Sequence, residues 1–295
     1  MIGLLNINKP ANWTSRDAVN RLQKLLAFKK IGHAGTLDPM ATGVLVMLIG
    51  PATRLTEFVQ RQRKFYRAGV RFGLTSTTDD IWGECQTVAA REFDRQELQS
   101  VVSQFVGQIQ QVPPRVSAVK IAGKRAYQRA RAGEQFEVKP RHVHVYSIEI
   151  VSFEYPNCVL QIECGSGTYI RSIARDIGAK LCSPAVMSSL ERTRIGNFPV
   201  QHALDFESLQ KQENARELLL ENTLPTRQAI SDIELIAIDE SGISALEFGR
   251  KLALNSEQPE LAVADQDGEL LAVMSRCQNG LYRPRINFVP ILRAG

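Results

Sequence analysis

The chain has 295 residues, of which 44% are hydrophobic and 23% are charged, an ordinary globular composition that excludes a disordered, collagen-like or membrane-embedded protein. At roughly 150 residues per domain, this length suggests two domains, or one large domain with an appendage. The net charge of +5 is unevenly spread. Residues 1–71 carry 12 Lys/Arg against 3 Asp/Glu and residues 112–145 carry 8 against 2, whereas residues 201–295 carry 9 against 15. The two basic blocks indicate a phosphate-rich partner for one part of the molecule.

Cysteine usage and the amino terminus indicate the compartment. The five cysteines are odd in number and lack Cys-x-x-Cys spacing, which argues against a disulfide framework and against a zinc knuckle. Residues 1–10 lack the pattern of a signal peptide. The longest apolar run, Val44 to Ile49, is far shorter than the roughly 20 residues that a membrane-spanning helix needs. We therefore expect a soluble, cytoplasmic protein.

In chain order, the first predicted elements are a helix and two strands. Apolar residues recur at helical spacing from Arg16 to Phe28, with Thr14 or Ser15 available as the cap. The uninterrupted apolar run over residues 44–49 is typical of a strand buried on both faces. Over residues 66–72, apolar and basic side chains alternate, which predicts a half-buried strand.

The rest of the chain predicts two more helices and several strands. A helix begins after Asp94, and its apolar spacing extends to Ile109, ahead of a Pro-Pro pair. Residues 158–164 alternate as a strand, and a Gly-Ser-Gly turn then leads into an amphipathic helix over residues 170–181. From about residue 230, short β-like runs separated by Asp-Gly and Asn-Gly turns predict a small, mostly β domain.

The segment most informative about chemistry reads Gly-His-Ala-Gly-Thr-Leu-Asp-Pro-Met-Ala-Thr-Gly over residues 32–43. Asp38 is the only acidic residue between Asp17 and Glu57, and Pro39 biases it toward extended geometry in a loop. Two interpretations are open at this point. Asp38 either caps a helix that begins at Pro39, or it is a nucleophilic carboxylate that surrounding cations keep ionised.

This segment, with the Val-Leu that follows it, resembles the catalytic motif of the bacterial tRNA pseudouridine-55 synthase (TruB) family. Further stretches match the same family in the expected order over about the first 200 residues. Several independent motifs in order are far more specific than any one of them. The matching stretches are Asn8-Lys9-Pro10 with Thr14-Ser15, Lys64-Phe65-Tyr66, Pro113-Pro114 with Ser117-Ala118-Val119-Lys120, Gly167-Thr168-Tyr169-Ile170-Arg171-Ser172, and Leu190 with Arg192-Thr193.

The resemblance implies an α+β fold with two domains. Residues 1–230 would form a catalytic domain of the pseudouridine synthase type on a mixed or antiparallel sheet, and residues 231–295 a small, mostly β, PUA-like domain. A basic arm over about residues 112–145 would grip the T-loop of tRNA. A second basic cluster also favours phosphate contacts; it comprises Arg61, Arg63, Lys64, Arg67 and Arg71.

The resemblance also implies an activity: isomerisation of the T-loop uridine at position 55 of tRNA to pseudouridine. The base would be flipped out, and the glycosidic bond broken and re-formed with the help of an aspartate, without a cofactor or metal. Asp38 would be the nucleophile, Tyr66 would stack on the flipped base, and Arg171 would pair with the nucleophile. The substrate-binding positions would be His33, Lys64, Tyr169, Leu190, Lys120, Lys124 and Arg125.

Plainer interpretations of single residues stand beside these roles. Without the resemblance, Tyr66 is a core tyrosine, and Arg171, with a second arginine one turn later, is a solvated side chain. His142 and His144 alternate on one strand, but no third ligand has suitable spacing, so a polar strand face is favoured over a metal site. Asn12 stands where the family often has glycine, and asparagine tolerates left-handed geometry.

Other functions fit the pattern less well. A non-catalytic RNA-binding or tRNA-folding module is the main alternative, because the basic blocks alone would suffice for it. A glycoside hydrolase needs a second carboxylate beside the first, and neither a dinucleotide fingerprint nor a Walker-type motif occurs. We expect tRNA, through its T-arm, as the partner of a monomer that needs no obligate protein partner.

Overall fold

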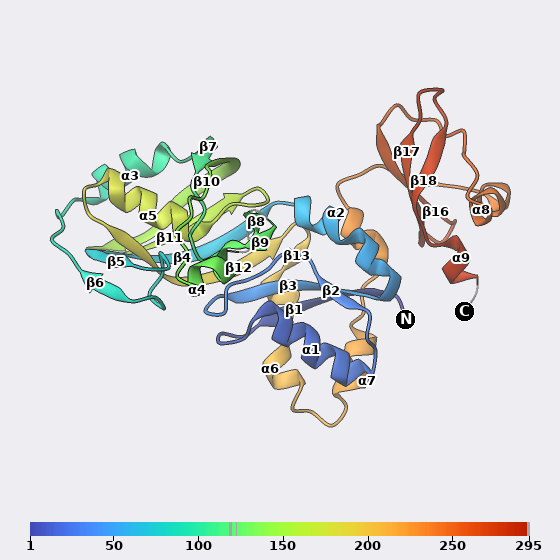
Figure 1. Cartoon of the computed structure of the whole chain (residues 1–295). Helices are drawn as coiled ribbons and strands as arrows, with labels where there is room; N and C mark the ends of the chain where they lie inside the picture. Colours follow the sequence, from blue (N-terminus) through green and yellow to red (C-terminus); the bar gives the residue numbers. More distant parts are fainter. Residues whose placement is uncertain (118–119, 122, 294–295) are drawn as a thin grey trace.

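The computed structural model describes residues 1–117, 120–121 and 123–293; the side chains of residues 120–121, 124–125, 127 and 130–131 also lie outside the description. Within these bounds, the centre of the fold is a ten-stranded sheet (Figure 1). Its strands are β1 (Gly3–Lys9), β2 (Ile31–His33), β3 (Thr42–Ile49), β4 (Lys64–Phe72), β7 (Gly107–Gln111), β10 (Arg141–Glu154), β11 (Asn157–Cys164), β12 (Ala185–Ile195), β13 (Phe198–Pro199) and β14 (Leu204–Asp205).

The sheet is mixed, as predicted. Its main path runs β14-β1-β3-β12-β4-β11-β10-β7, with β2 added beside β3 and β13 beside β12. The pairs β1–β14 and β3–β12 are parallel, and the other neighbours in the path are antiparallel. The parallel contact between β3 and β12 joins the two halves of the sheet, and the site described below lies at this junction.

Strand β3 is buried on both faces, as its continuous apolar run predicts. Val44, Val46 and Leu48 pack with Phe58 of α2 (Thr56–Arg61), beside the 3-10 helices η1 (Gly50–Leu55) and η3 (Thr226–Ile230). Leu45, Met47 and Ile49 face the opposite core, formed with α1 (Ser15–Leu26), α6 (Phe206–Leu209) and α7 (Ala215–Glu221).

The other half of the sheet has its own core. The helices α3 (Arg95–Ser103) and α5 (Ile170–Lys180) cover the face of β4, β10, β11 and β12 that carries the alternate apolar residues. On β4, Tyr66 and Val70 point into this core, whereas Arg67 and Arg71 are exposed on the other face. The predicted alternation of this strand is therefore confirmed.

The starts of the predicted helices are confirmed, but one end is wrong. Thr14 caps α1 in a capping box with Asp17, and Asp94 caps α3. Helix α3 ends at Ser103, whereas the apolar spacing extended it to Ile109. Gly107 adopts a φ of +102°, which favours glycine, and Ile109 lies on β7, where its backbone pairs with β10.

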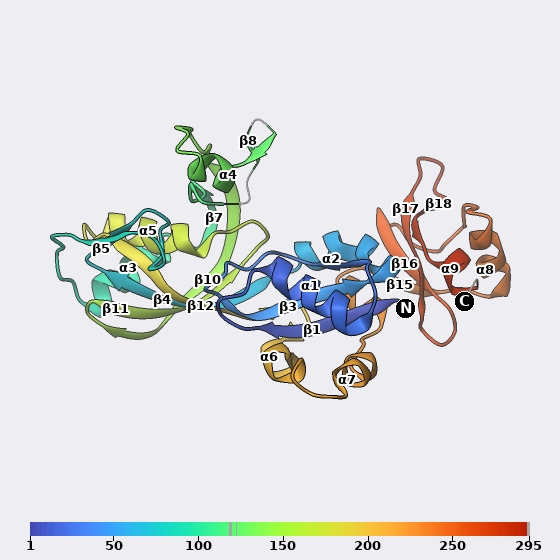
Figure 2. The same ribbon diagram turned by 60° about the horizontal axis from the view of Figure 1, so that its bottom comes forward.

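Between β7 and β10 the chain forms an arm that projects from the edge of the sheet (Figure 2). Its described elements are β8 (Lys120–Ile121), β9 (Lys124–Arg125) and α4 (Ala126–Arg131). A separate two-stranded ribbon, β5 (Leu74–Ser76) and β6 (Cys85–Thr87), follows β4.

The last part of the chain forms a four-stranded sheet, in line with the predicted small β domain. Its strands are β15 (Leu235–Ala237), β16 (Glu260–Ala264), β17 (Leu270–Arg276) and β18 (Tyr282–Asn287), in that order. The remaining elements are η2 (Val200–His202), α8 (Glu240–Glu247) and α9 (Val289–Leu292). No helix in the described part of the chain is long and apolar enough to cross a membrane.

Candidate active site

The glycine-rich segment forms the loop between β2 and β3 and presents Asp38 from a tight turn. The carbonyl of Asp38 accepts a hydrogen bond from the Ala41 N–H (3.0 Å), with Pro39 as the second residue of the turn. The chain then enters β3 directly, so the interpretation of Asp38 as a helix cap is wrong. The Asp38 side chain is 34% exposed, which leaves its carboxylate accessible to a substrate.

Lys9, in the first matching motif, and Asn12, which follows it, hold this turn through hydrogen bonds. The ammonium group of Lys9 donates to the carbonyls of Pro10 (2.7 Å), Trp13 (2.8 Å) and Pro39 (3.3 Å). Burial lowers the pKa of Lys9 to about 8. The Asn12 N–H donates to the Pro39 carbonyl (2.9 Å), and Asn12 has a φ of +68°, the left-handed geometry that its amide side chain tolerates.

Ser15, in the first turn of α1, holds the residue that precedes Asp38. The Leu37 N–H donates to the Ser15 hydroxyl (2.9 Å), which in turn donates to the Leu37 carbonyl (3.3 Å). Both groups are buried. The loop is therefore fixed on both sides of Asp38 by the first fifteen residues.

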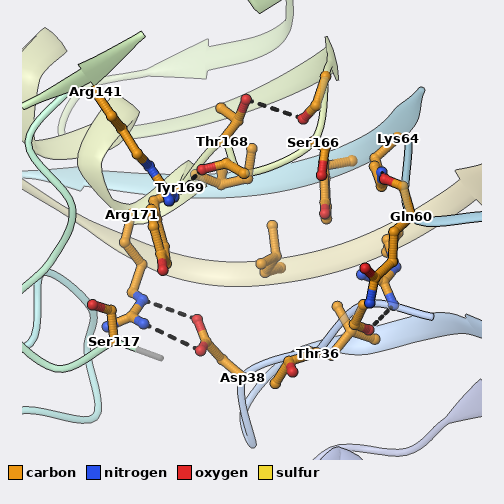
Figure 3. Close-up of a pocket in the computed structure, with 18 residues that line it drawn as sticks. Thr36, Asp38, Gln60, Lys64, Ser117, Arg141, Ser166, Thr168, Tyr169 and Arg171 are labelled. Carbon is orange, nitrogen blue, oxygen red and sulfur yellow. Dashed lines mark hydrogen bonds and ion pairs between the residues drawn. The ribbon is translucent and has the colours of Figure 1, made fainter. Parts of the chain in front are cut away.

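Arg171, from the first turn of α5, meets Asp38 from across the cleft (Figure 3). Its Nη2 donates to Asp38 Oδ1 (3.1 Å), and its Nε lies 2.9 Å from Asp38 Oδ2. The helical spacing of two arginines, taken without the family resemblance, favoured a solvated side chain, but Arg171 is only 5% exposed. The side-by-side contacts orient the carboxylate as well as neutralising it.

The guanidinium of Arg171 is itself held by two further segments. Nη1 donates to the Thr78 carbonyl (2.8 Å) and Nη2 to the Val116 carbonyl (3.1 Å). Nη1 also lies 3.5 Å from Oδ2 of Asp80, a carboxylate that is 8% exposed. Arg171 therefore joins the Asp38 loop, the residues after β5 and the base of the arm.

A cavity of about 300 Å³ opens beside Asp38, at the lower end of the range for small-ligand sites. Of the predicted site residues, Asp38, Lys64, Tyr66, Tyr169, Arg171 and Leu190 line it. The remaining lining residues are Gly35, Thr36, Leu37, Gln60, Ser117, Arg141, Gly165, Ser166, Gly167, Thr168, Ile170 and Arg192. Asp38 is the one acidic member of this set, which also includes four Lys or Arg side chains.

Tyr66 and Arg192 face each other across β4 and β12, where they are register partners. Arg192 is 1% exposed and donates to the carbonyls of Val44 (2.8 Å) and Gly35 (3.0 Å). Burial raises the pKa of the Tyr66 phenol above its ordinary value. Because the phenol then stays neutral near pH 7, Tyr66 offers the cavity an aromatic ring and a hydroxyl group rather than a phenolate base.

The second predicted basic cluster does not form one patch, because strand alternation divides it. Lys64 is 6% exposed, and burial lowers its pKa to about 8. Arg67 and Arg71 are exposed on the opposite face of β4. Arg61 pairs with Asp232 and Glu260, and Arg63 with Glu163. These five residues therefore form no single patch, and their contact with phosphates stays a prediction.

The remaining predicted residues lie outside the cavity or outside the description. His33, on β2, is half-buried and is not among the residues that line the cavity. The side chains of Lys120, Lys124 and Arg125 lie outside the described residues, although their backbones form β8 and β9. His142 and His144 are exposed on β10, and the residues that the structure describes contain no metal-binding cluster of His, Cys, Asp or Glu.

The site also depends on residues to which the sequence assigned no role. Lys9, Ser15 and Arg192 belong to matching motifs, and this membership is the signal that could have marked them; the structure shows that all three are buried. Asp80 carries no comparable signal. Its neighbour Asp79 is equally acidic, and only the tertiary fold brings Asp80 against Arg171.

Two family models match consecutive parts of the chain. Residues 23–170 match the TruB family pseudouridylate synthase N-terminal domain, and residues 171–234 match the tRNA pseudouridylate synthase B C-terminal domain. The first match contains Asp38 and ends at Ile170, one residue before Arg171.

Relatives and solved structures agree with these matches. The chain is 37% identical to the tRNA pseudouridine synthase B of Trichormus variabilis, over 99% of this chain and all of that protein. It is 39% identical to that of Clostridium tetani, over 85% and 86% of the two chains. In the crystal structure of a Cbf5-Nop10-Gar1 complex, one chain aligns with a TM-score of 0.73 at 26% identity, over 93% of this chain and 78% of that chain. The chain therefore belongs to the TruB family of pseudouridylate synthases.

Proposed function

We propose that the protein isomerises the T-loop uridine at position 55 of tRNA to pseudouridine, with Asp38 as the nucleophile. The observation that carries the proposal is the pairing of Asp38 with the buried Arg171 at the wall of a cavity that has aromatic and cationic sides. A carboxylate in cationic surroundings suits a phosphate-bearing substrate better than a neutral sugar.

The reaction rearranges one nucleotide without net gain or loss of atoms. The bond between uracil N1 and ribose C1′ breaks, a bond between C5 and C1′ forms, C5 loses a proton and N1 gains one. Asp38 acts on the nucleotide, and Arg171 neutralises and orients its carboxylate. Tyr66 stacks on the uracil, while Leu190 and Tyr169 close the cavity around it.

Access to the base requires that the uridine leave the T-loop. Flipping costs a few kcal/mol, and phosphate contacts together with aromatic stacking offset this cost. The arm between β7 and β10 supplies the phosphate contacts in this proposal, through Lys120, Lys124 and Arg125. We assign residues 1–230 to the catalytic domain and residues 231–295 to the small carboxy-terminal domain.

Asp38→Asn tests the proposal by separating chemistry from binding. The substitution removes a negative charge but preserves shape, so we expect pseudouridine formation to be abolished while the Kd for tRNA stays within about twofold. Asp267→Asn, in an exposed turn of the small sheet, is the matched control and should keep wild-type turnover. Turnover by Asp38→Asn would disprove the assignment of the nucleophile. Tight binding without turnover by the wild type would favour the non-catalytic RNA-binding module.

A further inference from the structure

The two residues that flank the arm in the sequence, Gln111 and Arg141, both hold the wall of the cavity. Gln111 is the last residue of β7 and Arg141 the first of β10, and the two are register partners in the sheet. Both side chains reach the loop over residues 165–169, which lines the cavity. The base of the arm is thus connected directly to the site.

The side-chain amide of Gln111 makes two hydrogen bonds with the backbone of Tyr169. The Tyr169 N–H donates to Gln111 Oε1 (2.8 Å), and Gln111 Nε2 donates to the Tyr169 carbonyl (3.0 Å). The Gln111 residue is only 1% exposed. A primary amide is well suited to such a pair, because it offers one acceptor and one donor side by side.

Tyr169 lies at the start of α5, so the position of its backbone affects the residues of the first helical turn. Tyr169 is the N-cap of the helix, and its own side chain makes no capping hydrogen bond. Arg171 follows two residues later and contacts both oxygens of Asp38. A shift of the Tyr169 backbone would therefore move Arg171 relative to Asp38.

Arg141, where the arm returns to β10, contacts the same loop as Gln111. The guanidinium carbon of Arg141 lies 4.6 Å from the centroid of the Tyr169 ring, and Arg141 also donates to the Gly167 carbonyl (Figure 3). On the side of the arm that follows β7, Ser172 Oγ donates to the carbonyl of Val112 (2.8 Å). Helix α5 is thus joined to the residues on either side of the arm.

We propose that Gln111 is a positioning residue for the reaction. It locks the start of α5 to the base of the arm, so that Arg171 meets Asp38 and the Tyr169 ring meets the bound nucleotide. Gln111 itself lies outside the set of residues that line the cavity and acts through Tyr169. The inference rests on the proposed function, since its readout is pseudouridine formation in tRNA.

The first test is Gln111→Met, which keeps the length of the side chain and removes both hydrogen bonds. We expect the single-turnover rate on saturating tRNA to fall roughly 10- to 100-fold, as for a displacement of catalytic groups by about 1 Å. The Kd for tRNA should change less than threefold, because the phosphate contacts remain. Gln110→Met is the matched control, since Gln110 is exposed on the same strand, and it should match the wild type. A rate for Gln111→Met within twofold of the wild type would overturn the proposal.

The second test, Gln111→Glu, uses pH within one folded variant. When the introduced carboxyl group is protonated, it reproduces the donor and the acceptor of the amide, whereas the ionised carboxylate presents a second acceptor to the Tyr169 carbonyl. Burial favours the neutral form, so the ratio of variant to wild-type rate should fall at least fivefold between pH 5.5 and pH 8. Gln110→Glu should show a constant ratio.

These outcomes separate two kinds of failure. If Gln111→Met does not fold, the pH series still decides, and a flat ratio for Gln111→Glu overturns the inference. If the wild type itself forms no pseudouridine, the proposed function fails instead. If the wild type is active and the Gln111 variants form pseudouridine at the wild-type rate, the proposed function is kept and the positioning role of Gln111 is rejected.

Discussion

Replacing Asp80 by Asn tests how Arg171, the partner of Asp38, is held in place. Asp80 Oδ1 accepts hydrogen bonds from Thr78 Oγ1 (2.6 Å) and the Trp82 N–H (3.0 Å), both of which an asparagine oxygen can keep. The change therefore removes mainly the charge that lies 3.5 Å from Arg171. At an effective dielectric constant of about 20, that attraction is about 5 kcal/mol before desolvation, and desolvation offsets much of it.

We expect Asp80→Asn to lower the free energy of unfolding by about 1–3 kcal/mol. The single-turnover rate should fall roughly 10- to 100-fold, because Arg171 loses one of its two carboxylate partners and moves relative to Asp38. Urea unfolding measures the stability, and conversion of saturating tRNA in a single turnover measures the rate.

Asp79→Asn is the matched control. Asp79 pairs with Arg175 (2.8 Å) and not with Arg171, and its φ of +63° suits asparagine. Burial raises the pKa of Asp79, so this residue contributes less to the free energy of unfolding as the pH rises above the ordinary pKa of an aspartate. A neutral residue at position 79 therefore costs little stability at pH 7. We expect wild-type turnover. If Asp80→Asn retained the wild-type rate, or if Asp79→Asn were equally slow, the reasoning about Arg171 would be refuted.

Three further predictions concern stability and RNA binding. Because burial lowers the pKa of Lys9 from 10.5 to about 8, the unfolded state binds more protons in that interval, and Lys9 should raise the free energy of unfolding by up to about 3 kcal/mol as the pH rises. In urea unfolding the rise should be smaller in Lys9→Met than in the wild type, because the buried Lys64 keeps its own contribution, and parallel profiles would contradict the prediction. Gly43 has a φ of +100°, and a Cβ there would lie 2.3 Å from the Arg192 carbonyl oxygen, so Gly43→Ala should destabilise by about 3 kcal/mol or more. Gly133→Ala, with no atom within 4 Å, should cost only about 1 kcal/mol, and equal losses in urea unfolding would refute the clash. If roughly six phosphates are contacted, log K for tRNA binding should fall against log salt with a slope of about −4 to −5, whereas a slope near zero would exclude phosphate contacts.

The sequence predicts correctly those helices and strands that depend on a local pattern, such as a capping pair or an alternation of side chains. Thr14 with Asp17 marks the start of α1, and the alternation of β4 places Tyr66 on the apolar face. The apolar spacing failed at Ile109, because residues on an edge strand matched a helical pattern by chance. Gly107, with its left-handed φ, was the signal against that extension.

The site was less accessible to local reasoning, because its contacts cross the chain. Asp38 and Arg171 are 133 residues apart, and only the family motifs placed them together. Asp-Pro is equally suited to a helix cap and to a turn, and the outcome depends on Asn12, Lys9 and Ser15 far from the turn. The alternation that correctly placed Tyr66 also implied that Lys64 points to the same side.

Locating every pseudouridine in the product decides whether position 55 of tRNA is the site of modification. Purified wild-type protein is incubated with an unmodified tRNA transcript, and every pseudouridine is located by chemical labelling and sequencing. We expect the wild type to convert the T-loop uridine at position 55 and no other uridine, and Asp38→Asn, assayed in parallel, to convert none. Pseudouridine formed elsewhere in the transcript, or none formed at all, would contradict this expectation.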